Sequence, residues 1–360
     1  MINVTQTFLP PLEEYVAQLQ RIWDSKWLTN RGELTFELEA KLKELLGVKS
    51  LLVVNNGTIA LQIAIKALDL TGEIITTPFS YVATVSSIVW ENCTPVFVDV
   101  DSRYLTIDET KIEAAITEKT SAILATHVYG NPCNVEAIAE IAEKHNLKII
   151  YDAAHCFGVK YKGESVLNWG DISTLSFHAT KLFHTGEGGG IVCRNDELAH
   201  RILYMHNFGH KGYEDYWGLG INGKISELQA AMGLAVLPHL DEIVAKRKSV
   251  CSLYDELLLP NTPLERPLVR AETDYNYAYY PILFPTEQAL LNVKNALNEK
   301  EIFPRRYFYP ALDRLPYVND ADLPVSNDVS KRVLCLPLFA ELEAQSAVGI
   351  CDSIKQALGE

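Results

Sequence analysis

Two kinds of hydrophobic pattern alternate along the first two thirds of the chain. Short apolar runs predict strands, at residues 50–54, 73–77, 94–98, 121–127, 148–151, 173–178 and 191–193. Stretches with an apolar residue at every third or fourth position predict amphipathic helices, at residues 11–24, 34–46, 59–68, 82–90, 109–116, 135–145 and 196–205. This alternation is typical of an α/β protein in which helices cover both faces of a large, mostly parallel sheet.

The pattern changes after residue 205. The segment 206–223 is rich in Gly, Tyr and His and predicts an irregular loop. Beyond it, helices are predicted at 225–237, 240–258, 287–300 and 345–358, with strand-like segments at 275–284 and 302–307. We therefore expect a large α/β domain at 1–239, which includes the N-terminal segment, and a small C-terminal α/β domain at 240–360.

Composition narrows the class of protein. The 360 residues are 48% hydrophobic and carry a net charge of −14, which argues against nucleic acid as a partner. The chain has no apolar run long enough to span a membrane and no signal-peptide pattern, so no membrane association is expected. The seven cysteines are scattered and form no CxxC pair, which favours free thiols in the cytoplasm and no metal site.

Reactive residues follow two of the predicted strands. Asp152 and His155 come after the run 148–151, and Lys181 comes after 173–178 and before the sequence GEGGG. Thr58 and Tyr81 also fall just after predicted strands. Because parallel strands release their carboxyl ends at one edge of a sheet, Thr58, Tyr81, Asp152 and Lys181 are expected to converge in one pocket. A lysine can form a Schiff base with an aldehyde cofactor, and a carboxylate can keep its ring nitrogen protonated.

Each of these residues also has a structural interpretation. Lys181 could be a solvated surface lysine, Asp152 a helix N-cap, and His155 an ordinary half-buried histidine. The turn at Gly57 and Thr58, between a strand and a helix, suits a phosphate at the helix N-terminus, but it could also be a simple cap.

Together the motifs resemble the DegT/DnrJ/StrS family of sugar aminotransferases. The matching segments are WLTNRG, NNGTIAL, TTPFSYVAT, PVFVDVD, YDAAHCFG, SFHATK, GEGG, GINGKISELQAAMG and VLCLPLF. The resemblance covers almost the whole chain and implies the type I, aspartate-aminotransferase-like fold of pyridoxal-phosphate-dependent transferases. Family members that have replaced the lysine perform dehydration, so Lys181 favours an aminotransferase.

The resemblance also implies roles by position. The catalytic residues would be Lys181, Asp152 and His155. The cofactor, pyridoxal 5'-phosphate, would be held by these three and by Gly57, Thr58, Tyr81, Ser176 and Asn222. Asn222 would reach the cofactor of a neighbouring subunit, which implies a homodimer with shared active sites. The substrate would contact Thr29, Asn30, Arg31, Arg305, Arg306, Tyr307 and Tyr309. Residues 27–29 could instead be a surface loop with a packed Trp, Arg305 and Arg306 a solvated pair, and the two tyrosines packing residues.

The implied reaction moves the amino group of L-glutamate, through pyridoxamine 5'-phosphate, to a nucleotide-linked keto-deoxysugar. The expected acceptor is dTDP-4-keto-6-deoxyglucose, giving dTDP-4-amino-4,6-dideoxyglucose for polysaccharide synthesis. His155 and the SFH sequence at 176–178 favour carbon 4, since many carbon-3 members carry Gln and Tyr there. The alternatives are amination at carbon 3 of a dTDP-3-keto-6-deoxysugar, and a non-catalytic regulatory protein that binds the cofactor.

Overall fold

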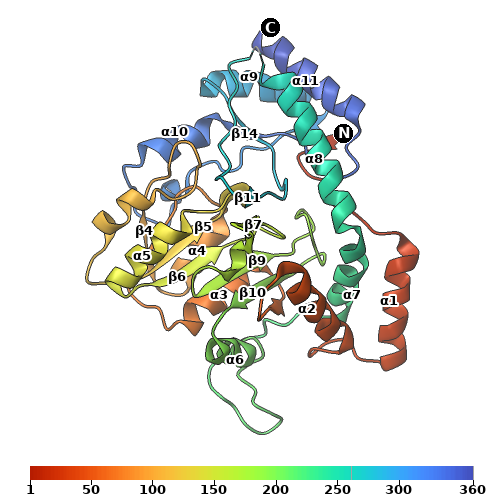
Figure 1. Cartoon of the computed structure of the whole chain (residues 1–360), viewed down its shortest axis with the longest axis vertical. Helices are drawn as coiled ribbons and strands as arrows, with labels where there is room; N and C mark the ends of the chain where they lie inside the picture. The colour runs from red at the N-terminus through yellow and green to blue at the C-terminus, as the bar shows by residue number, and fades with distance from the viewer. Residues whose placement is uncertain (261, 360) are drawn as a thin grey trace.

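A seven-stranded sheet lies at the centre of the molecule (Figure 1), for which a computed structural model describes residues 1–260 and 262–359. Its strand order is β2 (Leu52–Val54), β10 (Gly189–Cys193), β9 (Ile172–Ser176), β6 (Lys148–Asp152), β5 (Thr120–Thr126), β3 (Glu73–Thr76) and β4 (Thr94–Phe97). Six of these seven strands run in one direction, and β10 runs opposite to them. The predicted large, mostly parallel sheet is therefore confirmed.

Helices cover both faces of the sheet because neighbouring strand residues point to opposite sides. Ile74 and Ile150 pack with α3 (Gly57–Ala67), α4 (Val82–Trp90) and α6 (Asp196–Met205). Ile75 and Ile149 pack on the other face with α5 (Val135–His145). On that second face, α2 (Glu33–Leu46) and α7 (Glu227–Val236) cover the β2–β10–β9 end, and α1 (Leu12–Ser25) packs on α7.

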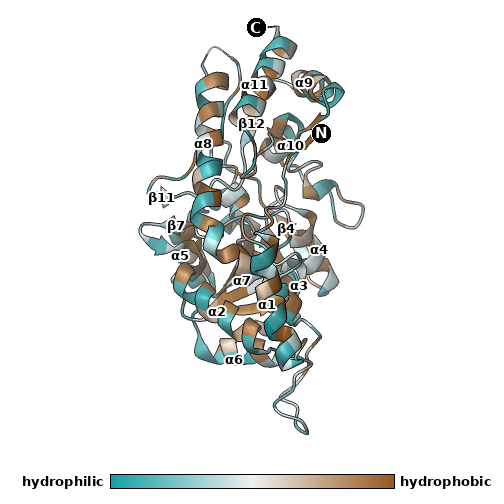
Figure 2. Ribbon diagram, turned by 90° about the vertical axis from the view of Figure 1, so that its right-hand side faces the viewer, coloured by the Kyte–Doolittle hydropathy of each residue, from teal (hydrophilic) through white to brown (hydrophobic). Residues whose placement is uncertain are grey.

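A second apolar cluster forms between residues 250 and 354. It is built from α8 (Leu240–Leu258), α9 (Glu287–Glu299), α11 (Ala344–Leu358) and the strand pair β12 (Pro281–Leu283) and β14 (Val333–Cys335). In Figure 2 the long helix α8 alternates between hydrophilic and hydrophobic colours, as an amphipathic helix should. The cluster supports a division of the chain near residue 240, which remains a proposal. The predicted small domain, 240–360, includes residues 261 and 360, which lie outside the described residues.

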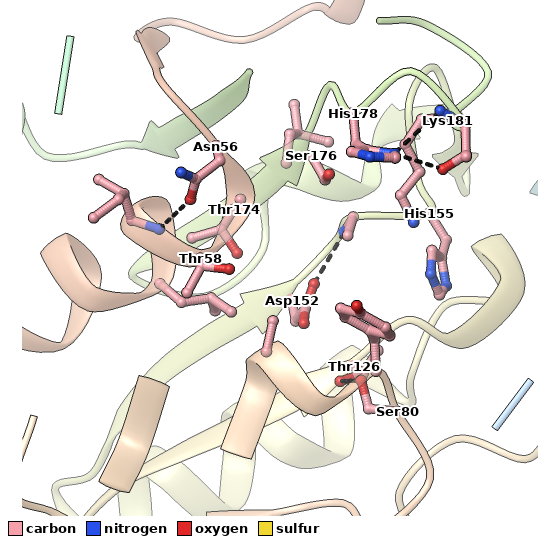
Figure 3. A pocket seen from close by; sticks show the side chains of 18 of the residues that line it. Asn56, Thr58, Ser80, Thr126, Asp152, His155, Thr174, Ser176, His178 and Lys181 are labelled. Carbon is pink, nitrogen blue, oxygen red and sulfur yellow. Dashed lines mark hydrogen bonds between the residues drawn. The ribbon is translucent and has the colours of Figure 1, made fainter. Parts of the chain in front are cut away.

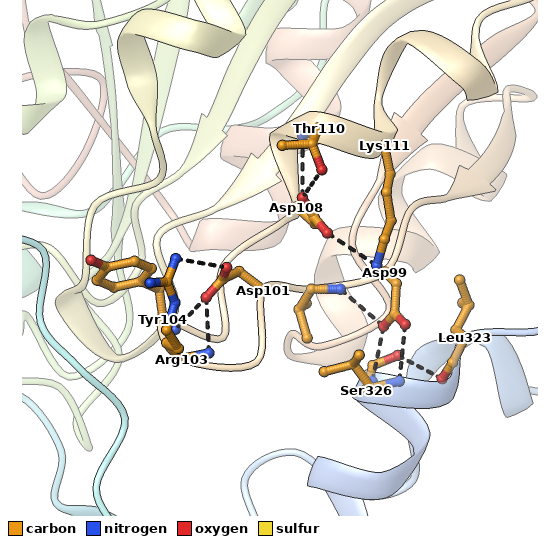
Figure 4. A network of polar contacts seen from close by, with 11 residues as sticks. Asp99, Asp101, Arg103, Tyr104, Asp108, Thr110, Lys111, Leu323 and Ser326 are labelled. Carbon is orange, nitrogen blue, oxygen red and sulfur yellow. Dashed lines mark hydrogen bonds and ion pairs between the residues drawn. The ribbon is translucent and has the colours of Figure 1, made fainter.

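Several contacts join the two parts. The N-terminal strand β1 (Ile2–Asn3) pairs with β13 (Ile302–Phe303). Asp99, just after β4, accepts the backbone N–H groups of Val325 and Ser326 at 2.9 Å, at the start of α10 (Pro324–Arg332; Figure 4). A small sheet combines β7 (Lys160–Tyr161), β8 (Glu164–Ser165) and β11 (Thr273–Asp274). No helix in the described part of the chain is long and apolar enough to cross a membrane.

Three local predictions were wrong. The segment 275–284 is a strand only at 281–283, because Tyr277 has a left-handed φ of 54° and its carbonyl accepts a hydrogen bond from a side chain. The segment 302–307 is a strand only at 302–303. The predicted helix at 109–116 is two short 3-10 turns, η1 (Glu109–Lys111) and η2 (Glu113–Ala115). Further 3-10 turns of the described residues are η3 (Val128–Gly130), η4 (Val166–Asn168), η5 (Leu237–His239) and η6 (Leu312–Arg314).

Candidate active site

A cavity of about 620 Å³ opens at the carboxyl ends of β5, β6 and β9 and at the N-terminus of α3 (Figure 3). This is where an α/β sheet is expected to hold its ligand. The residues predicted for the site that line this cavity are Gly57, Thr58, Tyr81, Asp152, His155, Ser176, Lys181, Arg305 and Tyr307. Tertiary structure therefore brings together side chains that are up to 250 positions apart in the sequence.

The N-terminus of α3 forms one wall, with donors suited to an anion. The side chain of Asn56 caps the helix by accepting the Ile59 backbone N–H at 2.8 Å. The backbone N–H groups of Gly57 and Thr58, the first two residues of the helix, have no acceptor within it. A Cβ at Gly57 would lie 3.0 Å from the Ser176 Cβ, so glycine lets the helix end approach the serine hydroxyl. The backbone amides, the hydroxyls of Thr58 and Ser176 and the helix dipole together suit a phosphate at this place.

Asp152 is a buried carboxylate at the end of β6. It accepts hydrogen bonds from the Thr84 hydroxyl at 2.7 Å and the Ala154 backbone N–H at 3.1 Å. Within the described residues it forms no ion pair, and burial raises its pKa although both hydrogen bonds and the charge of Lys181 oppose this shift. A buried carboxylate without a cation is costly unless a ligand supplies one. The protonated nitrogen of a pyridine ring would do so.

His155 lies on the same wall with one ring nitrogen already used. The backbone N–H of Tyr129 donates to His155 Nδ1 at 3.0 Å. Burial, and secondarily the charge of Lys181, lowers the pKa of His155 well below its usual value. The imidazole is therefore neutral with its proton assigned to Nε2, which leaves one N–H donor.

Lys181 sits on the loop after β9, where its amine faces the cavity (Figure 3). Backbone hydrogen bonds from Phe177 to Gly188 (2.8 Å) and from Ala179 to Gly186 (2.7 Å) fold this loop onto the glycine cluster. The Lys181 Nζ donates to the Tyr279 hydroxyl at 3.0 Å. A primary amine and an unpaired carboxylate thus share one cavity with an anion site, and this set of residues fits pyridoxal phosphate.

The two adjacent arginines predicted to bind substrate have different surroundings. Arg305 lines the cavity with Tyr307. Arg306 is directed elsewhere, donating to the Glu287 carboxylate at 2.7 Å and lying 3.5 Å from the ring centroid of Tyr309. Arg306 and Tyr309 are not among the residues that line the cavity.

Four further predicted residues lie outside the cavity that one chain forms. Thr29 and Asn30 are exposed on the turn between α1 and α2, and Arg31 pairs with the buried carboxylate of Glu39 at 2.5 Å. Asn222 is exposed in the predicted irregular loop, where its side-chain oxygen accepts a hydrogen bond from Lys224 at 2.6 Å.

Sequence patterns did not indicate several residues of the site. Behind Asp152, a chain of hydroxyl groups continues from Thr84. The hydroxyls of Thr84 and Ser80 are 2.7 Å apart, and the Thr126 hydroxyl donates to that of Ser80 at 3.0 Å. Tyr279 comes from the C-terminal part of the chain. The four-residue spacing of Ser80 and Thr84 at the start of a helix was a usable signal, whereas nothing local to Tyr279 indicated its contact with Lys181.

Comparison with known proteins agrees with this geometry. The DegT/DnrJ/EryC1/StrS aminotransferase family matches residues 12–355. A dTDP-4-amino-4,6-dideoxy-D-glucose transaminase from Shigella dysenteriae is 45% identical, over 99% of this chain and 98% of that protein. A protein of the same description from Escherichia coli is 42% identical, over 97% and 96%. The solved structure of DesI in the presence of its TDP-sugar product is 30% identical with a TM-score of 0.94, over 99% and 93%.

Pyridoxal phosphate is the cofactor of this family, and the cavity holds a fitting residue for each of its polar groups. The helix N-terminus suits the phosphate, Asp152 the ring nitrogen, and Lys181 the aldehyde. The likeness to solved aminotransferases also confirms the predicted fold. The chain therefore belongs to the DegT/DnrJ/EryC1/StrS aminotransferase family and is a pyridoxal-phosphate-dependent aminotransferase.

Proposed function

We propose that the protein transfers the amino group of L-glutamate to dTDP-4-keto-6-deoxyglucose and forms dTDP-4-amino-4,6-dideoxyglucose. The observation that carries this proposal is the identity of 45% and 42% with two dTDP-4-amino-4,6-dideoxy-D-glucose transaminases, over nearly the full length of each. Relatives named GDP-perosamine synthase are less similar, at 31–33% identity.

Bound pyridoxal phosphate supplies an aldehyde that accepts an amino group and a ring that withdraws electrons from the bond broken next to it. The ionised Asp152 would keep the ring nitrogen protonated, which strengthens that withdrawal. The neutral His155 would donate its Nε2–H to the phenolic oxygen. The backbone amides of Gly57 and Thr58, with the Ser176 hydroxyl, would hold the phosphate, and the exposed face of Tyr81 would stack on the ring.

Lys181 would carry the protons. Its amine would take a proton from the amino-bearing carbon of glutamate in the first half-reaction. In the second, it would deliver a proton to carbon 4 of the sugar. Both steps need Lys181 to be free and close to the reacting carbon, which its place on the cavity wall supports.

Arg305 and Tyr307 are the substrate contacts that the cavity supports. The guanidinium would pair with the diphosphate of the nucleotide sugar. We further propose a homodimer in which Asn222 of each chain completes the site of the other, together with the 29–31 turn. Asn222, Thr29 and Asn30 are exposed in the single chain. The seven cysteines are all free and buried, which supports a reducing compartment such as the cytoplasm.

The absorption spectrum tests this function. Purified protein loaded with pyridoxal phosphate should show a visible band that bleaches when L-glutamate is added and returns with dTDP-4-keto-6-deoxyglucose. The Lys181→Ala variant should lack the original band. A visible band that Lys181→Ala leaves unchanged, or that glutamate leaves unchanged, would contradict the proposal.

Two alternatives have specific support among the relatives. A UDP-N-acetyl-3-dehydro-alpha-D-glucosamine 3-aminotransferase from Acidithiobacillus ferrooxidans is 32% identical, which keeps amination at carbon 3 as a candidate. A pleiotropic regulatory protein from Geobacillus stearothermophilus is 33% identical. Return of the band with a dTDP-3-keto sugar alone would favour the first, and a band that responds to no amino donor would favour the second.

A further inference from the structure

Tyr279 is the polar partner of the Lys181 amine. The Lys181 Nζ donates to the Tyr279 hydroxyl at 3.0 Å and lies 5.7 Å from the centroid of the tyrosine ring. Tyr279 is only 8% exposed, and its side chain lines the cavity. The contact joins residues 98 positions apart, one on the loop after β9 and one just before β12.

The tyrosine ring is held between other aromatic side chains. Its centroid lies 4.7 Å from that of His155, edge to face, and 5.7 Å from that of Tyr307. These contacts fix the ring plane, and therefore the direction of the hydroxyl.

The backbone that carries Tyr279 is fixed by two buried side chains. Arg247, on α8, donates to the carbonyls of Tyr277 at 3.1 Å and Ala278 at 3.0 Å. The amide of Asn276 donates to the carbonyls of His155 at 2.8 Å and of Phe157 at 3.0 Å. The segment before β12 is thus bonded directly to the backbone that presents His155, so the tyrosine hydroxyl has a defined position in the cavity.

We propose that Tyr279 is a positioning residue that orients the Lys181 amine whenever Lys181 is not bound to the cofactor. The inference rests on the proposed function, in which Lys181 must be released and then act as a base. A free lysine side chain has four rotatable bonds and would spread over many rotamers. The hydrogen bond to a rigid hydroxyl restricts Nζ to the cavity wall. The amine therefore stays within reach both for cofactor capture and for proton transfer.

The test compares Tyr279→Phe with Tyr254→Phe in the full chain. Tyr254 is a matched control because its buried hydroxyl also makes one hydrogen bond, to the Pro337 carbonyl at 2.9 Å, and it does not line the cavity. Stopped-flow absorbance measures the rate at which cofactor-free protein captures pyridoxal phosphate. We expect capture by Tyr279→Phe to be about tenfold slower than wild type, as the loss of one oriented hydrogen bond implies. Capture by Tyr254→Phe should stay within twofold.

A second measurement separates positioning from damage to the pocket. Pyridoxamine phosphate forms no bond with Lys181, so its dissociation constant should be unchanged in Tyr279→Phe. In the glutamate half-reaction, the maximal rate should fall about tenfold while the KM for glutamate stays constant.

The outcomes distinguish the two proposals. If wild type captures the cofactor and reacts with glutamate, but Tyr279→Phe captures it equally fast or faster, the positioning role is wrong and the proposed function stands. Equal slowing in both phenylalanine variants, or weaker binding of pyridoxamine phosphate, would also overturn positioning. If wild type itself fails to react with glutamate, the proposed function fails instead.

Discussion

Replacing Asp152 with Asn should stabilise the cofactor-free protein while it impairs the enzyme. The carboxylate is buried, and it has two hydrogen-bond donors but no ion-pair partner among the described residues. An asparagine has the same shape. Its oxygen can accept the Ala154 N–H, and its amide can donate to the Thr84 hydroxyl, which can in turn donate to Ser80. The substitution therefore removes a charge while the side chain keeps its contacts with Ala154 and Thr84.

The size of the effect follows from the cost of an unpaired buried charge. Removing it should raise the free energy of unfolding by roughly 1–3 kcal/mol near neutral pH. In a thermal melt this is a rise of roughly 1–4 °C in the midpoint for a chain of this length. With pyridoxal phosphate bound, the order should reverse, because the wild-type carboxylate then has a cation. Cofactor affinity and turnover of Asp152→Asn should fall about 10- to 100-fold.

The pH dependence gives an independent check. The pKa of Asp152 in the folded protein is raised, so the unfolded chain releases this proton at a lower pH than the native state does. Wild-type stability therefore falls as the pH rises from the unfolded value, about 4, through the folded pKa. The advantage of Asp152→Asn should vanish below about pH 4 and reach its full size above the folded pKa.

Asp99 provides the opposite control. It is also a buried aspartate, but it accepts three backbone N–H groups, from Val100, Val325 and Ser326, each at 2.9 Å (Figure 4). Asparagine has a single acceptor oxygen, so Asp99→Asn should lower the melting midpoint of the cofactor-free protein. A melting midpoint of Asp152→Asn at or below that of wild type at pH 8 would refute the reasoning about the unpaired charge.

Three other changes test the proposed roles. Mixing Lys181→Ala and Asn222→Ala subunits should restore activity above that of either variant alone, because a mixed dimer with shared sites has one intact site. The assay is turnover after the subunits reassemble. No restoration of turnover would contradict the shared site. Arg305→Met should raise the KM for the nucleotide sugar about tenfold or more without changing the glutamate half-reaction, whereas Arg306→Met should mainly lower the melting midpoint, since its guanidinium is bonded away from the cavity; equal KM effects would argue against this assignment. Gly57→Ala would bring a Cβ within 3.0 Å of a neighbouring side-chain atom and should therefore weaken cofactor binding about tenfold in an absorbance titration. Unchanged affinity would show that cofactor binding does not depend on this close approach.

The sequence alone predicted the sheet, most of its helices and the edge where the cavity lies. These predictions succeeded because hydrophobic periodicity is a local signal and because parallel strands end at a common edge. The positions of Asp152 and Lys181 at or shortly after the ends of apolar runs therefore indicated a shared cavity. The motif order also identified the family, which fixes the cofactor.

Tertiary structure alone decided which polar residues reach the cavity and what holds them there. Arg305 and Arg306 are adjacent and chemically identical, yet only Arg305 lines the cavity, because Arg306 is bonded to Glu287 on α9. Tyr279 has no local pattern that ties it to Lys181. Such contacts join residues that are distant in sequence and depend on how separately formed elements pack. Patterns among neighbouring residues do not predict this packing.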